Sequence, residues 1–192
     1  MTKLFNSAEK LLTRFVCYAI VGWIYEEVLW ILDEHLLVNR GMCLGPWLPI
    51  YGFGGLIIYA TLYRYSKRPF PSENFNLKPL LVFVIVSVAS AAIELASTYL
   101  MDLAGGDFHS LWAYDEYAIN FQERIALLPS LQFGALGCII LYLAQDRIDR
   151  FVNSDKQSTT RVRYALCAVF LVDLIVHLII GSNYTENVIM AF

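Results

Sequence analysis

The chain has 192 residues, of which 58% are hydrophobic and only 16% are charged, and its mean hydropathy is +0.54. These values exclude an ordinary soluble domain and predict a small all-α membrane protein with several spans. The formal charge of −3 is uninformative by itself, and we expect no nucleic-acid partner. No GxxxxGK[ST] phosphate loop is present, so an ATP-driven role would require a partner ATPase.

Five apolar segments follow one another along the chain, and each is long enough to cross a hydrocarbon core about 30 Å thick. We therefore expect a polytopic helix bundle of about five transmembrane helices, forming a single integral membrane domain over residues 1–192. Ahead of them, residues 1–12 place apolar side chains at helical spacing opposite two lysines, which predicts a short interfacial helix. The segments are approximately 12–32, 49–65, 79–101, 128–144 and 164–181.

The basic residues predict the orientation of the bundle. Twelve of the 14 lysines and arginines fall in the N-terminal segment and in the loops after the second and fourth apolar segments. Positive charge concentrates on the cytoplasmic side, so we expect a cytoplasmic N-terminus and an extracytoplasmic C-terminus. Only Arg40 and Arg124 fall on the outer side, which makes them candidates for a specific role.

Two outer connections are unlike ordinary loops. Residues 41–55 carry Gly41, Gly45, Pro46 and Pro49, and an interior proline costs a helix about 3 kcal/mol. We expect a re-entrant segment packed inside the protein, with the next helix beginning near Pro49.

The second unusual connection spans residues 105–128 and is called the lid below. It alternates aromatic residues with acidic ones. That mixture is typical of the headgroup level, either as an interfacial cover over the outer face or as a simple aromatic belt.

Ionisable residues inside apolar segments are costly and mark functional sites by default. Glu26 lies in the first segment, and Glu94 lies in the third on a stripe of small and polar residues that also suits close helix packing. Both lie in the outer halves of their segments, whereas the inner halves are almost wholly apolar. We therefore predict one outward-facing polar cavity, whose substrate-binding residues are Glu26, Asn39, Arg40, Tyr51, Glu94, Asn120 and Arg124.

Asp173 and His177 lie four residues apart on one face of the fifth segment. The spacing suits a proton relay, two metal ligands, or a structural hydrogen-bonded pair. No third ligand lies nearby in sequence, and the four cysteines are scattered without a CxxC pair. We therefore expect neither a metal nor a cofactor.

A faint internal repeat is also present. Glu26, Asn39-Arg40 and the run from Pro49 to Phe53 are echoed by Glu94, by Asn120 with Arg124, and by the run from Pro129 to Gly134. Both units would begin on the cytoplasmic side, which describes a parallel repeat with the last helix appended. The spacings differ, so chance similarity is the alternative.

Several of these motifs resemble the type IV ABC-transporter permease family of bacterial membrane proteins. The first half matches through Gly22-Trp23-x-x-Glu26, Asn39-Arg40-Gly41, Gly45-Pro46 and the Pro49–Gly54 run. The second half is similar around Glu94 and Arg124 but departs from the family at three places: Ala113 and Asp115 alter a Trp-Asp-Tyr-Ser box, Glu123 replaces glycine, and Phe133 replaces tryptophan.

The resemblance implies a multi-pass transport component of the bacterial inner membrane, surrounded by lipid and working with a partner ATPase or as a homo-oligomer. The cavity would then receive an anionic group at the arginines or a cationic group at the glutamates. The one-sided polarity equally suits a membrane-embedded enzyme that acts on a lipid or lipid-linked headgroup at the outer leaflet, with a glutamate as general base. A structural scaffold is the third possibility.

Overall fold

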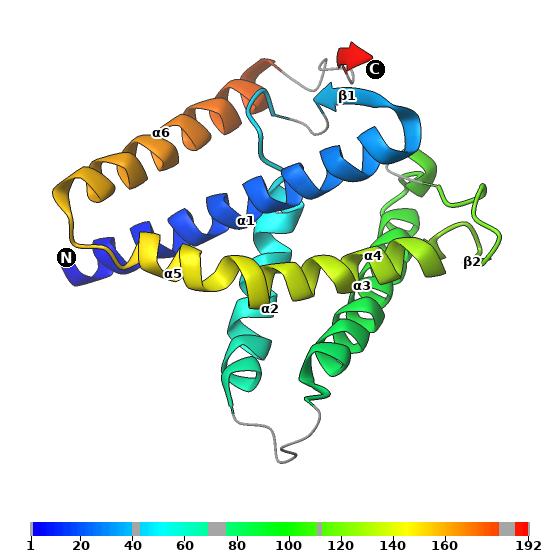
Figure 1. Ribbon diagram of the computed structural model, residues 1–192. Coiled ribbons are helices and arrows are strands. Elements are labelled where there is room, and N and C mark those ends of the chain that lie inside the picture. The colour runs from blue at the N-terminus through cyan, green and yellow to red at the C-terminus, as the bar shows by residue number, and fades with distance from the viewer. Residues whose placement is uncertain (1, 40–42, 69–75, 111–112, 181–186, 192) are drawn as a thin grey trace. The chain divides into compact units, whose positions relative to one another are not determined.

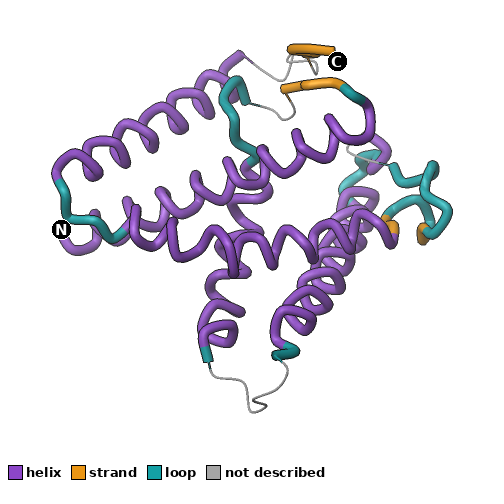
Figure 2. The backbone as a smooth tube through the Cα atoms, viewed as in Figure 1, coloured by secondary structure: helices purple, strands orange, loops and turns teal. Residues whose placement is uncertain are grey.

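Helices make up most of the computed structural model, which describes residues 2–39, 43–68, 76–110, 113–180 and 187–191 (Figures 1 and 2). A π-helical stretch, Ile139–Ala144, joins two of the helices, so Leu127–Val152 forms one continuous rod. The remaining elements are a 3-10 turn, Phe108–Ser110, and four short strands. The helices are α1 (Thr2–Glu34), α2 (Pro49–Lys67), α3 (Lys78–Leu103), α4 (Leu127–Cys138), α5 (Gln145–Val152) and α6 (Gln157–Ile180), and the strands are β1 (Leu36–Asn39), β2 (Asn120–Phe121), β3 (Ile125–Ala126) and β4 (Asn187–Ala191).

The helical surfaces are those of a membrane protein. Within the described residues, four segments are long and apolar enough to cross a bilayer. Large apolar side chains cover their outer faces; Leu103 is 85% exposed, for example, and Val88 is 64% exposed. Apolar surface on that scale requires a lipid or protein neighbour. The four segments are Asn6–Leu32, Lys78–Leu103, Leu127–Val152 and Gln157–Ile179.

The expected count of five spans is only partly supported. Helix α2 has 19 residues but is not among the four apolar segments, because tyrosines, glycines and Arg64 dilute its hydropathy. It begins at Pro49, as the sequence predicted, and residues 43–48 before it are not helical. Cys43 and Trp47 are buried there, whereas Leu44 is 55% exposed. The re-entrant character of this segment therefore stays a prediction.

The N-terminal segment differs from its expected form. Residues 2–12 do not make a separate short helix, because α1 runs without a break from Thr2 to Glu34. Whether the first turns lie at the membrane interface stays a prediction. At its other end α1 stops at His35, whose backbone takes the left-handed conformation (φ 56°).

The chain divides into two compact units, Met1–Thr61 with Tyr142–Phe192 (unit 1) and Leu62–Leu141 (unit 2). Unit 1 therefore combines the two ends of the sequence, whereas unit 2 is continuous. The single-domain organisation that we expect from the sequence stays a prediction, and each unit is described by itself below.

In unit 1, α6 packs along α1 and is tied to it at both ends (Figure 1). Near the two N-termini, Arg163 of α6 donates from Nε to Glu9 Oε1 of α1 at 2.8 Å. Beyond the two C-termini, β1 pairs antiparallel with β4. Because both ends match, α1 and α6 run in the same direction. Their shared core consists of Phe15, Val16, Ala19, Cys43, Trp47 and Phe170.

Buried polar contacts add to this core. Arg163 also donates to the carbonyl of Ser154 at 2.8 Å, which fixes the connection between α5 and α6. Arg14 forms an ion pair with Asp149 at 2.9 Å. Sequence reasoning counted Arg14 and Arg163 only as markers of the cytoplasmic side, but both also hold helices together.

In unit 2, α3 and α4 approach closely at two glycines of α4. A Cβ atom at Gly134 would clash with Ser87 and would lie 2.7 Å from the carbonyl oxygen of Phe83. A Cβ atom at Gly137 would lie 2.9 Å from the side chain of Val86. Small residues at such positions let membrane helices pack backbone to backbone. The small-residue stripe of α3 is therefore, at least in part, a packing seam.

Candidate functional site

Glu94 lies on α3, and only one of its two carboxylate oxygens accepts a hydrogen bond from the described residues. The hydroxyl of Tyr114, from the lid, donates to Oε1 at 2.7 Å. Oε2 is buried and has no hydrogen-bond partner within the described residues. Ser90 and Thr98, one turn away on either side, donate instead to carbonyls of their own helix. A buried carboxylate oxygen without a partner is costly, so Oε2 is the natural place for a proton or a cation.

Arg124 fastens the lid to α3. Its Nη2 donates to Oδ2 of Asp102 at 2.5 Å. The guanidinium also lies 4.0 Å from the ring centroid of Phe108 and 4.6 Å from that of Tyr99, both within the range of cation–π attraction. Asp102 lies eight residues after Glu94, a rise of about 12 Å along the helix. In this structure Arg124 is therefore paired with Asp102, and Glu94 with Tyr114.

A small hairpin, β2 with β3, carries Arg124. Its turn places Gln122 at φ 54° and Glu123 at φ 59°, and the amide of Arg124 donates to the carbonyl of Phe121 at 3.1 Å. Two successive positive φ values make a type I′ turn, which favours glycine or asparagine. Glu123 is the position at which the resembled family carries glycine, so this departure leaves an acidic residue where the backbone favours glycine.

Asn120, predicted as a substrate-binding residue, holds this turn together. Its Oδ1 accepts the amide of Glu123 at 3.2 Å, and its Nδ2 donates to the carbonyl of Tyr117 at 2.8 Å. Tyr99 of α3 donates its hydroxyl to Oε1 of Gln122 at 2.6 Å, a further tie between α3 and the hairpin.

His109 forms an exposed charge cluster on the lid. Its Nδ1 lies 2.8 Å from Oδ1 of Asp107, and its Nε2 lies 3.4 Å from Oε2 of Glu123. The hydrogen bond to Asp107, followed by that to Glu123, raises the pKa of His109 above its ordinary value. The same contact with His109 lowers the pKa of Asp107. The lid thus has a tie that strengthens when His109 is protonated.

In unit 1 the structure brings together two of the predicted site residues. The hydroxyl of Tyr51, in the first turn of α2, donates to Oε1 of Glu26 on α1. Gly22, one turn before Glu26, leaves the space that the Tyr51 side chain occupies, because a Cβ atom there would clash with it. Arg40 lies outside the described residues. Asn39 ends β1, and its side chain is not described.

Asp173 holds the segment that precedes α2. Its Oδ1 accepts the amide of Leu44 at 3.1 Å, and its Oδ2 accepts the amide of Gly45 and the indole N–H of Trp47, each at 2.8 Å. The residue is only 8% exposed. Nothing in the sequence indicates this role, because two of the donors are backbone groups and all three lie about 130 positions away.

His177 lies one turn after Asp173 and is also buried, and its Nδ1 has no hydrogen-bond partner within the described residues. Both oxygens of Asp173 are engaged by the segment before α2, so Asp173 acts here as a structural acceptor. The proton relay between Asp173 and His177 stays a prediction.

The structure therefore places the predicted substrate-binding residues in separate contacts. Glu26 meets Tyr51 in unit 1, and Glu94 meets Tyr114 in unit 2. The convergence of all seven predicted residues on one cavity stays a prediction. Sequence reasoning missed Asp102 as the partner of Arg124. The signal was present, because Asp102 follows Glu94 and Thr98 at intervals of four residues and so continues their side of α3.

Long apolar helices with exposed apolar faces, carrying carboxylates that other polar side chains engage, define a polytopic integral membrane protein. The model of the family described as Putative ABC-transporter type IV matches residues 13–178, and the chain belongs to this family. The match confirms the resemblance seen in the sequence motifs. Neither a curated protein nor a solved structure matches the chain.

Proposed function

We propose that this chain is the membrane-embedded component of a transporter, and that the face of α3 around Glu94 lies on the path of its substrate. Family membership supports a transport role. The observation that carries the proposal is the hydrogen bond between Glu94 and Tyr114, because it joins an acid of an apolar helix to a residue of the lid. Opening the lid would expose the carboxylate, and closing it would restore the tyrosine contact.

The contacts of Arg124 favour a cationic group over an anionic one as the ligand of this face. An anion that used Arg124 would lie beside Asp102, which already provides a charge-assisted hydrogen bond at Nη2 and would repel it. Glu94 has a buried oxygen without a hydrogen bond in the described structure, so a cation or a proton would displace nothing there.

The full proposal keeps the outward-facing cavity and the topology expected from the sequence. The N-terminus would be cytoplasmic and the C-terminus extracytoplasmic, in the bacterial inner membrane. Energy would come from a partner ATPase or from an ion gradient, either in a single chain or in a homo-oligomer. The residues proposed to converge on the cavity are Glu26, Asn39, Arg40, Tyr51, Glu94, Asn120 and Arg124.

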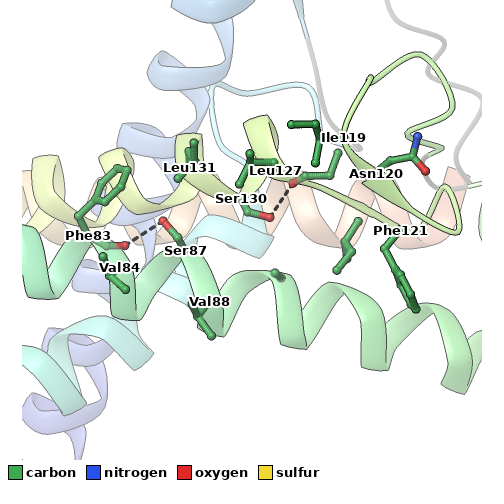
Figure 3. A pocket seen from close by; sticks show the side chains of 13 residues that line it. Phe83, Val84, Ser87, Val88, Ile119, Asn120, Phe121, Leu127, Ser130 and Leu131 are labelled. Atoms are coloured by element: carbon green, nitrogen blue, oxygen red, sulfur yellow. Dashed lines mark hydrogen bonds between the residues drawn. The ribbon is translucent and has the colours of Figure 1, made fainter.

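A second candidate function is an enzyme that acts on a lipid, and a groove in unit 2 favours it (Figure 3). The groove has a volume of about 430 Å³ and lies among α3, the start of α4 and the hairpin. Its lining is almost wholly apolar, which suits an acyl chain. Its two serines, Ser87 and Ser130, donate to the carbonyls of Phe83 and Ala126 at 2.9 and 2.7 Å. Neither serine is therefore held by a side-chain base, as a nucleophile would be.

One experiment separates the two functions. The purified chain in lipid nanodiscs would be screened for thermal stabilisation by a panel of organic cations, organic anions and lipid-linked compounds. Each stabilising compound would then be offered in radiolabelled form to proteoliposomes, with and without an ion gradient, and recovered for mass spectrometry. We expect a cation to accumulate unchanged, and we expect Glu94→Gln to abolish its uptake.

The matched control is Asp115→Asn, an exposed acid of the same lid, which should leave uptake unchanged. Recovery of a chemically altered compound would replace transport by the enzyme function. Uptake that is unaffected by Glu94→Gln would remove Glu94 from the substrate path.

A further inference from the structure

The first helix pair has a definite contact register. In α2, Gly52 faces Phe15 of α1, because a Cβ atom there would lie 2.7 Å from the Phe15 ring. One turn later Gly55 faces Tyr18, and a Cβ atom there would clash with it in the same way. At the contact between α1 and α2, two glycines of α2 that are three residues apart therefore pack on Phe15 and Tyr18 of α1, which are also three residues apart.

The second helix pair repeats this register. In α4, Gly134 faces Ser87 and Phe83 of α3, and Gly137, three residues later, faces Val86. Phe83 and Val86 lie 68 positions after Phe15 and Tyr18 in the chain. Gly134 and Gly137 lie 82 positions after Gly52 and Gly55. The echo noticed in the sequence thus has a physical counterpart at these positions, because glycines 82 positions apart face residues that are 68 positions apart, although α4 packs against α3 more extensively than α2 packs against α1.

The two glutamates are also separated by the offset of 68 positions that relates α1 to α3. Glu94 lies 68 positions after Glu26, so each acid follows its glycine-facing phenylalanine by 11 positions. In both helix pairs a tyrosine hydroxyl donates to Oε1 of the glutamate, from Tyr51 in one and from Tyr114 in the other. The tyrosines come from different elements, and the glycines of the second pair lie 14 positions farther from their partner residues in the chain, partly because the connection before α4 is longer than the one before α2.

We infer that α1–α2 and α3–α4 are two copies of one helix pair, and that Glu26 and Glu94 are equivalent sites that each take up and release one proton. The second half of this inference rests on the proposed transport function, because proton exchange at these sites would couple substrate movement to a proton gradient. Parallel repeats of this kind are a known way of building a transporter.

The surroundings of the two acids suit a proton better than a metal ion. A carboxylate inside a bilayer is costly, and it becomes neutral by binding a proton from the aqueous phase. The titratable groups near Glu94 are Tyr114 and, two turns further on, Asp102 with its partner Arg124. Those near Glu26 are Tyr51 of α2 together with Tyr25 and Glu27 of its own helix. The hydroxyls one turn from Glu94 on α3, those of Ser90, Ser97 and Thr98, donate to backbone carbonyls, so they are not oriented as metal ligands.

The duplication is tested by substituting each interface glycine with alanine. The changes Gly52→Ala, Gly55→Ala, Gly134→Ala and Gly137→Ala should each lower the melting temperature of the detergent-solubilised chain. The control is Gly54→Ala, because a Cβ atom at Gly54 would meet nothing within 4 Å and should be tolerated. A tolerated alanine at both glycines of either pair would overturn the shared register.

Proton binding is tested with a hydrophobic carbodiimide, which reacts only with protonated carboxyl groups, followed by peptide mass spectrometry. We expect modification of both Glu26 and Glu94, falling as the pH is raised, and loss of each modified peptide in Glu26→Gln or Glu94→Gln. Tyr51→Phe should increase labelling at Glu26 alone, and Tyr114→Phe at Glu94 alone, because each change removes the hydroxyl that contacts Oε1 of that acid.

Glu27 provides the internal control, because the position 68 residues later is Leu95 and the duplication gives it no counterpart. Modification of only one of the two glutamates, or of Glu27 to the same extent, would overturn the inference. The readout does not depend on transport. Labelling of both acids without uptake in proteoliposomes would count against the proposed function alone, and uptake with labelling of one acid would count against the inference alone.

Discussion

The ties that hold unit 1 are mostly buried, whereas several of those that fasten the lid of unit 2 are partly exposed. Glu9, Arg163 and Asp173 are 8%, 5% and 8% exposed. In the lid, the side chain of Arg124 is 13% exposed, but those of its partner Asp102 and of Glu123 are 38% and 51% exposed. Breaking a buried ion pair strands a charge, whereas an exposed pair exchanges one partner for water. We therefore expect unit 1 to resist local opening more strongly than the lid does.

The largest effect should come from breaking the buried pair of unit 1. Arg163→Met leaves Glu9 as an unpaired buried acid and releases the carbonyls of Phe151 and Ser154, so we expect a loss of about 3–5 kcal/mol in stability. Thermal unfolding of the solubilised chain measures it. Arg161→Met, at an exposed position two residues earlier, is the control and should change little. Equal losses from the two substitutions would remove the distinction between unit 1 and the lid.

Asp173→Asn should have the next largest effect. An amide cannot accept hydrogen bonds at both of its terminal atoms, so at least one of the donors Leu44, Gly45 and Trp47 loses its acceptor. A hydrogen bond to a charged group contributes about 1.5–3 kcal/mol, and we expect a loss in that range.

Release of this segment should also expose Cys43, which is only 2% exposed in the structure. Maleimide labelling of a variant that retains Cys43 as its only cysteine should therefore accelerate after Asp173→Asn. The control Asp155→Asn, at an exposed acid, should leave labelling slow. If Cys43 stays protected in Asp173→Asn, the segment is held by packing instead.

Asp102→Asn should alter the lid with a smaller effect on overall stability. Its bond to Arg124 is partly exposed, so we expect at most about 1 kcal/mol, decreasing with salt. Hydrogen exchange of residues 117–126 should nevertheless accelerate, because the guanidinium no longer anchors the hairpin. Asp115→Asn is the control. Unchanged exchange in Asp102→Asn would show that the aromatic contacts of Arg124 suffice.

Glu123→Gly should stabilise the hairpin of the lid, which is the opposite of the effect expected for Asp102→Asn. A non-glycine residue at positive φ costs about 1–2 kcal/mol, and glycine removes most of that cost while losing the contact with His109 and adding freedom to the unfolded chain. We expect a small net stabilisation, up to about 1 kcal/mol, and slower exchange in the hairpin. Destabilisation by Glu123→Gly would show that the contact with His109 outweighs the turn geometry.

The smallest expected effect is the pH dependence of the contacts that His109 makes in the lid. Because its carboxylate partners raise the pKa of His109, its ties to Asp107 and Glu123 are fully present below the ordinary value of about 6.5 and are lost as the pH rises through the raised value. Asp107→Asn should lower the pKa of His109 as measured by NMR. Exchange in the lid should then become less dependent on pH between 6 and 8.

The elements of this fold were largely predictable from the sequence, because apolar length and proline position are local signals. Helix α2 begins at Pro49, and the apolar segments of α1, α3, α4 and α6 appear where the hydropathy placed them. The lid also differs from both of its neighbouring helices, as its composition indicated. The break expected near residue 12 is absent, because the polar residues there, Glu9 and Thr13, face Arg163 and Cys167 of α6.

The partners of the site residues were far less predictable. Sequence reasoning set the two glutamates against the two outer arginines by charge alone. The structure gives each glutamate a tyrosine hydroxyl and gives Arg124 a nearer acid, Asp102. A tyrosine hydroxyl has no formal charge, and so it carries no weight in an argument from charge balance. Similarly, nothing in the sequence around Asp173 identifies backbone amides of residues 44 and 45 as its partners.

The division of unit 1 between the two ends of the sequence has a consequence for biosynthesis. Unit 2 is continuous, so its helix pair can assemble as soon as residue 141 has left the translocon. Unit 1 cannot close until Arg163 and Asp173 of the last helix have been made, and Glu9 and the segment at residues 44–47 must wait for them. During that interval the first helix pair carries an uncompensated acid. A ribosome stalled before residue 157 should therefore hold a nascent chain that is readily degraded, and release of the final helix is the step that protects it.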